Sequence, residues 1–237
     1  SEAEQASAIL RSVRRMQETL LARAVATVFQ PIVALEDGSV AGYVAVHEGS
    51  GIDLYRPEED GRLLSRDCRL TSRVRQLRRL LAAEEAARLP DGSLLVVSLD
   101  ASEIGTRALP DSLGEVRGRL GGGWRLAVEI PDSAVSDNPY AQQLQRDLEA
   151  RDIALACGPF SGSMQHLEPA AVRPDYLRLA PASIRGIDRR PDRQRWLKAA
   201  AETARGWGAD LIAEGIQTKS EAATCLTLGC RLGQGQG

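Results

Sequence analysis

Five polar side chains could do chemistry because each stands at or near the end of a predicted strand. Two of them, Glu129 and Glu214, are carboxylates, which can hold a metal ion or move a proton. Arg178 carries a guanidinium fork that suits a carboxylate or a phosphate, and the alternative to catalysis is a structural ion pair with Glu129. Gln30 and Gln234 can hold a ligand through their amides. These residue types favour a ligand pocket if the fold brings them together.

The strands that carry these residues alternate with helices, which indicates a parallel sheet. An Asp37-Gly38 turn joins the first two strands, so these two should pair antiparallel. About eight strands in one domain of 237 residues favour an α/β fold of the closed, TIM-like β/α barrel type, with the first strand antiparallel and any site at the carboxyl ends. The predicted strands are residues 27–35, 40–46, 94–99, 125–130, 152–156, 175–179, 209–213 and 231–232.

Apolar residues at helical spacing predict a helix before the barrel, at about residues 4–24. We expect residues 1–25 to be a linker or signalling helix that packs on its own domain or on a second copy, and residues 26–237 to form the barrel domain. A long helix is expected at 63–89, with a ridge of arginines that is either solvated or faces an acidic partner or phosphates. The clearest later helices are predicted at 133–150, 191–207 and 219–228.

Composition excludes several classes of protein. The formal net charge of -2 argues against nucleic acid as a partner, because binding through bulk electrostatics needs a basic excess. The sequence has no apolar run long enough to span a membrane. Its four cysteines are scattered, which predicts reduced thiols in a cytoplasmic protein rather than a disulfide framework or a zinc site.

Ordered motifs resemble those of EAL domains, the bacterial cyclic di-GMP phosphodiesterases. The run 29–33 (FQPIV) followed by 42–46 (GYVAV) is similar to the family's opening, and its naming Glu-Ala-Leu triplet falls on residues 44–46. Similar segments follow in the family's order at 128–130 (VEI), 174–180 (PDYLRLA), 213–218 (AEGIQT), 228–230 (LGC) and 234–235 (QG). The resemblance covers about residues 27–235 and implies the barrel fold, with its first strand antiparallel.

The same resemblance implies two-metal hydrolysis of a phosphodiester, which needs several anionic oxygen ligands. Most of the family's ligands fall on other residue types here. Its triplet Glu falls on Val44 and a metal-binding Asn on Ser98, while its Asp pair falls on Ala156 and Cys157. The family's active-site Lys falls on Arg178. The full set of departures is Val44, Glu48, Ser98, Ala156, Cys157, Ala180 and Gln217.

We therefore expect a degenerate EAL domain with no catalytic residues and no metal or other cofactor. The leading hypothesis is a catalytically inactive regulatory module of bacterial signalling that binds a protein partner or forms a homodimer. The alternative is a non-hydrolysing cyclic di-GMP receptor that keeps a remnant pocket of Gln30, Glu129, Arg178, Glu214 and Gln234. Glu48 counts against it, because this residue stands where the family has a phosphate-contacting Arg. A residual or altered hydrolase is the third reading.

Overall fold

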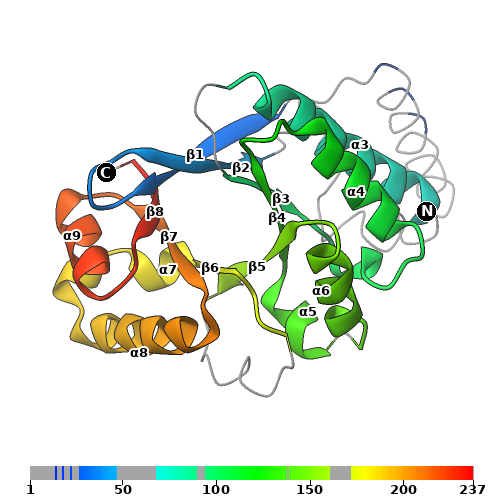
Figure 1. Ribbon diagram of the computed structural model, residues 1–237. Helices are drawn as coiled ribbons and strands as arrows, with labels where there is room; N and C mark the ends of the chain where they lie inside the picture. The colour runs from blue at the N-terminus through cyan, green and yellow to red at the C-terminus, as the bar shows by residue number, and fades with distance from the viewer. Residues whose placement is uncertain are drawn as a thin grey trace, which may run out of the picture.

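Eight strands close into a barrel in the computed structural model of the chain (Figure 1). The structure describes residues 27–46, 68–89, 94–137, 139–160 and 172–236, together with Arg14, Glu18 and Ala22. Neighbours in the barrel follow the order of the sequence. The strands are β1 Val28–Ala34, β2 Val40–Val46, β3 Leu94–Ser98, β4 Arg125–Ile130, β5 Ile153–Phe160, β6 Tyr176–Leu179, β7 Asp210–Ile216 and β8 Leu232–Gly235.

β1 is antiparallel to both of its neighbours, β2 and β8, and all other pairs are parallel. The predicted hairpin between the first two strands is confirmed. In its turn, Ser39 donates from its backbone N–H and from its hydroxyl to Asp37, at 2.9 and 2.6 Å. These donors lower the pKa of Asp37 from its ordinary value. The closed, mixed barrel expected from the strand pattern and from the motifs is therefore the fold observed.

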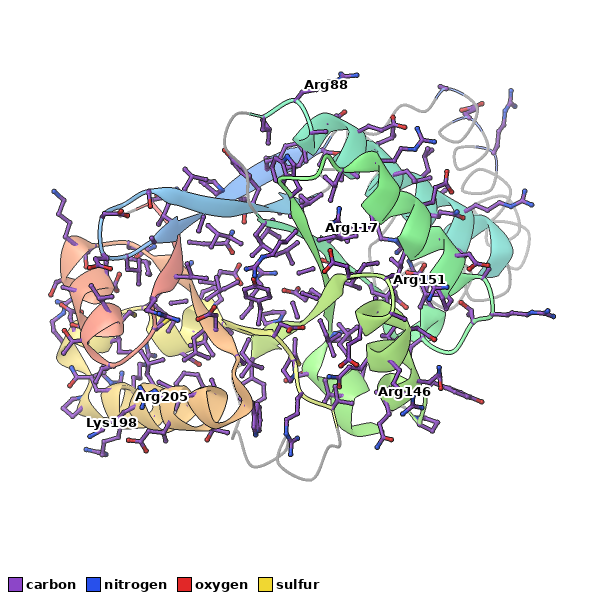
Figure 2. All side chains as sticks on the ribbon, in the orientation of Figure 1. Arg88, Arg117, Arg146, Arg151, Lys198 and Arg205 are labelled. Carbon is purple, nitrogen blue, oxygen red and sulfur yellow. The ribbon has the colours of Figure 1, made fainter. Side chains whose placement is uncertain are left out.

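Helices surround the ring of strands (Figure 1). Figure 2 shows the exposed Arg88, Arg146 and Lys198 at the periphery, on or next to these helices. Among the described residues, no helix is long and apolar enough to cross a membrane. The helices are α3 Cys68–Ala86, α4 Leu109–Arg119, α5 Asp132–Asp137, α6 Ala141–Glu149, α7 Pro181–Ile184, α8 Pro191–Trp207 and α9 Lys219–Thr227, with 3-10 turns at Ala101–Glu103 and Ile187–Arg189.

Alternation along each strand divides the core into two layers. The larger layer lies between strands and helices and includes Leu126, Leu155 and Cys157. The smaller layer fills the barrel itself, and its buried members are Ile32, Val44, Leu94, Val96, Ala127, Ala156, Tyr176 and Ile212. These side chains close the barrel interior below its carboxyl end, so polar chemistry is confined to the mouth.

Two predicted helices differ from the observed ones. The single helix expected at 133–150 is wrong, because α5 and α6 are separate helices. Pro139 lies between them, and proline lacks the N–H that would continue a helix and disfavours helical backbone at the residue before it. The long helix expected at 63–89 is observed as α3, and residues 63–67 lie outside the described chain. Of the helix expected at 4–24, only Arg14, Glu18 and Ala22 are described, each as helical, and the domain boundary near residue 25 lies outside the described ranges.

Glu221 links two loops next to the barrel mouth. It is the N3 residue of a capping box at the start of α9, where Thr218 is the N-cap. Its carboxylate accepts hydrogen bonds from the backbone N–H groups of Gly186 (2.5 Å), Gln217 (2.7 Å) and Thr218 (3.1 Å). Burial raises the pKa of Glu221, but these donors outweigh burial and lower it. The charged carboxylate therefore holds the loop after β7 against the turn after α7.

Replacing Glu221 with Gln should destabilise the fold by about 1 to 3 kcal/mol at neutral pH, because an amide oxygen cannot serve three donors. A lowered pKa means that this stabilisation is present above the ordinary value of 4.5 and is lost as the pH falls through the folded-state value. The difference between wild type and variant should therefore shrink in acid. Urea unfolding across this pH range measures it, with the exposed Glu202→Gln on α8 as the control. A difference independent of pH would contradict this role.

Candidate functional site at the barrel mouth

Strand register brings the predicted site residues together at the carboxyl end of the barrel. Ser98 pairs with Glu129 across β3 and β4, and Glu129 pairs with Ala156 across β4 and β5. On the opposite wall, Glu214 of β7 pairs with Gln234 of β8. Gln30 of β1 pairs with Val44 of β2. Since each strand alternates between its two faces, these positions and Arg178 share the inner face.

Arg178 is the centre of the mouth. Its guanidinium donates to Glu129 at 2.5 Å and to Glu214 at 3.0 Å, so one side chain of β6 ties β4 to β7. The side chains of Arg178 and Glu129 are 8% and 7% exposed, whereas that of Glu214 is 26% exposed. The ion pair expected between Glu129 and Arg178 is therefore confirmed, and Glu214 joins it at the solvent side.

Small residues on β5 make this bridge sterically feasible. β5 lies between β4 and β6, and Ala156 faces the barrel interior there with only a methyl group. The guanidinium of Arg178 can therefore cross β5 to reach Glu129. Gly158 on the same strand lies against β6, where an added Cβ would come within 2.7 Å of the carbonyl oxygen of Arg178. A larger residue at either position would push β6 or its arginine away.

The electrostatics of the bridge are dominated by burial. Burial raises the pKa of Glu129 from its ordinary value, and the neighbouring charge of Glu214 acts in the same direction. Arg178 opposes this rise through its charge and its hydrogen bond. Two carboxylates share one cation, so the cluster carries one excess negative charge when both are ionised. The guanidinium has its two NH groups engaged and its buried Nε without a partner among the described residues.

A cavity of about 350 Å³ opens beside the bridge, between β1, β7, β8 and the start of α7. Gln30, Glu214 and Gln234 of the predicted set line it, together with Gln217. Gln234 donates weakly to the carbonyl oxygens of Gln30 and Pro31, at 3.3 and 3.5 Å. Its own amide oxygen is buried without a partner among the described residues. A buried acceptor without a partner is costly, so a donor that reached it would be stabilised.

Two polar residues of the cavity were not among the site residues predicted from the sequence. Arg185 follows the short helix α7, and Gln236 follows β8, and both line the same cavity. Gln236 stands two residues after Gln234, so the alternation of the strand pattern could have indicated it. Arg185 offers no such signal, because a four-residue helix leaves no periodicity to detect.

The positions that depart from the family pattern lie in different places. Val44 and Ala156 are buried in the barrel core, while Cys157 lies in the outer layer between strands and helices. Burial raises the pKa of the Cys157 thiol to about 12, so it stays protonated. Ala180 precedes α7 as its N-cap residue. Ser98 and Gln217 are exposed at the mouth, and Glu48 lies outside the described residues.

The fold and the mouth define a mixed eight-stranded β/α barrel with a polar site at the carboxyl ends of its strands. The family model described as "EAL domain" matches residues 13–237, so the chain belongs to the EAL domain family. A search of curated proteins found no match.

Solved structures of EAL domains share this fold. The FimX EAL domain of Xanthomonas citri, solved with c-diGMP, is 20% identical at a TM-score of 0.80, over 99% of this chain and 94% of that one. The FimX EAL domain of Pseudomonas aeruginosa, bound to c-di-GMP, is 18% identical at a TM-score of 0.76. The match covers 94% of this chain and 93% of that one. The EAL enzyme Bd1971, bound to cAMP and cyclic di-GMP, is 16% identical at a TM-score of 0.76. That match covers 98% of this chain but 66% of the Bd1971 chain.

The residues present at the mouth do not fit a pair of divalent ions. Among the described residues, no three His, Cys, Asp or Glu side chains gather as a metal site. The two carboxylates at the mouth, Glu129 and Glu214, already share a guanidinium that would repel a cation. Val44 and Ala156 present only hydrocarbon to this space. No hydrolytic step through metal ions can be built from these side chains.

Arg178→Met should destabilise the protein by about 3 to 5 kcal/mol at neutral pH, because it leaves two carboxylates at the mouth without their cation. The pKa of Glu129 should then rise further, so protonation at lower pH should recover part of the loss. Chemical unfolding at neutral and mildly acidic pH measures both effects. Adding Glu129→Gln to Arg178→Met should also recover part of the loss. Additive effects of the two substitutions would show that the pair is not coupled.

Proposed function

We propose that this EAL domain does not hydrolyse cyclic di-GMP and instead acts in cyclic di-GMP signalling as a regulatory module that binds another protein or a second copy of itself. The single observation that carries the proposal is the Arg178 bridge to Glu129 and Glu214. A cation fixed in the protein takes the two carboxylates that a metal ion would need. On this proposal, the domain keeps the barrel fold of the family and has lost phosphodiester hydrolysis.

Both the charge of the mouth and the lack of an activated nucleophile count against hydrolysis. Hydrolysis of a phosphodiester at a two-metal site depends on ions that activate a water molecule and clamp the attacking and leaving oxygens. Among the described residues, the centre of the mouth offers two carboxylates and one internal arginine, which together leave one excess negative charge. Glu129 is buried against that arginine, and a general base without an activated water has little to act on.

A second candidate function is a cyclic di-GMP receptor, favoured by the cavity beside Gln30, Gln217 and Gln234. Amides and an exposed arginine, Arg185, can hold a nucleotide without metals. The FimX EAL domains of similar fold are solved with c-di-GMP bound. Against this candidate, Glu214 lines the same cavity and would repel a phosphodiester. The receptor reading therefore requires the amides and Arg185 to outweigh that carboxylate.

Purified protein should show no hydrolysis of cyclic di-GMP with Mg²⁺ or Mn²⁺ above the rate in buffer, because the mouth cannot clamp two ions. The rate of nucleotide cleavage is followed by chromatography, with an active EAL phosphodiesterase as the positive control. Metal-dependent turnover that Glu129→Gln abolishes would overturn the proposed loss of catalysis. Turnover unchanged by Glu129→Gln would indicate a contaminating enzyme and calls for repurification before the assay is scored.

Titration calorimetry with cyclic di-GMP separates the two candidates. A receptor should bind at micromolar or tighter Kd, about -8.2 kcal/mol or more, and Gln234→Leu should weaken binding at least about tenfold. Gln143→Leu, an exposed substitution on α6, is the matched control and should leave binding unchanged. No heat of binding up to high micromolar nucleotide would remove the receptor and leave the partner-binding module.

A further inference from the structure

A second pocket lies on the other side of the mouth, where α3 passes the carboxyl end of β3. Its volume is about 260 Å³, and it shares no lining residue with the cavity lined by Gln30, Gln217 and Gln234. Three arginines of one helix face, Arg75, Arg78 and Arg79, contribute to it. Ser98 at the end of β3 and two carboxylates of the following turn complete the polar lining. We refer to it below as the α3 pocket.

Two of the three arginines are neutralised by carboxylates of this turn. Arg79 forms a bidentate pair with Glu103, at 3.0 and 2.8 Å, and both side chains are 4% exposed. Arg75 pairs with Asp100 at 2.9 Å. Asp100 is itself fixed by the Ser102 backbone and hydroxyl. These pairs hold α3 against the end of β3 and fix the shape of the pocket.

Arg78 has no such partner. Among the described residues, no carboxylate pairs with it, and its buried Nε donates no hydrogen bond. Burial lowers the pKa of Arg78, and the positive charge of Arg75 acts in the same direction. A half-buried guanidinium beside a like charge is costly unless an anion compensates it. Counted over the described residues that line the pocket, three arginines stand against two carboxylates, an excess of one positive charge.

We propose that the α3 pocket binds a phosphate group of a small molecule in its singly charged form, with Arg78 as the main ligand. One negative charge balances the excess. The guanidinium of Arg78 on α3 and the exposed hydroxyl of Ser98 on β3 lie in the lining of one cavity. The fork of an arginine suits two oxygens of either a carboxylate or a phosphate. A donor from a second element needs a further oxygen, which a phosphate has and a carboxylate lacks. The site does not depend on whether the mouth hydrolyses or binds a nucleotide.

Inorganic phosphate is the probe, titrated at mildly acidic pH, where it is mostly singly charged, against chloride at matched ionic strength. The Nε–H signals of the arginines are followed by NMR. The signal of Arg78 should shift along a saturable curve, whereas that of Arg73, an exposed arginine of the same helix, should not. A signal of Arg78 that does not move, or that drifts linearly as Arg73 does under salt screening, would overturn the proposal.

Arg78→Met keeps most of the apolar stem and removes the charge, so it separates binding from structure. This variant should lose the phosphate-dependent rise of the melting temperature, with at least a tenfold weaker affinity, while Arg73→Met keeps both. Without phosphate, Arg78→Met should melt at the same or a higher temperature, because an uncompensated charge has been removed. A lower melting temperature of the phosphate-free variant would show that Arg78 serves the fold, and would contradict the proposal.

Discussion

The architecture of the mouth depends on one guanidinium. Arg178 reaches from β6 across the methyl group of Ala156 to Glu129 on β4, and turns its other nitrogen to Glu214 on β7. An ion cluster of this kind contributes little net stability over a hydrophobic replacement, but loss of one member is costly because charges are left unpaired. The cluster therefore selects one arrangement of three strands. It also buries the carboxylate of Glu129 and engages that of Glu214, which stays partly exposed.

Charge is distributed unevenly around the same opening. At the centre, two carboxylates share one arginine, so the excess is negative. On the side of α3, the described lining has three arginines and two carboxylates, so its excess is positive and resides on Arg78. Between β1 and β8, the lining is dominated by neutral amides. This order of negative, positive and neutral surfaces differs from the uniformly acidic floor that a pair of divalent cations would need.

Much of the fold could be predicted because it follows from local patterns. Alternation of strands and helices indicated the barrel, and the Asp37-Gly38 turn indicated its antiparallel first strand. Boundaries were less reliable. Helix periodicity continues through Pro139, so apolar spacing alone predicted one helix where there are two. α7 is only four residues long, and its role in placing Arg185 at the cavity leaves no trace in periodicity. Short elements are placed by tertiary contacts, which a pattern over neighbouring residues does not contain.

The sequence by itself determined the family, the order of the strands and the chemical character of each position at their ends, because side-chain types and the alternation of strands are local properties. It also indicated the pairing of Glu129 with Arg178, since the fork of an arginine suits a carboxylate. Only the tertiary structure decided that Glu214 joins this pair and that Cys157 faces away from the mouth. It also decided that Arg75 and Arg79 are neutralised while Arg78 pairs with no carboxylate among the described residues. These outcomes depend on distances between residues far apart in the chain, and barrel closure sets those distances.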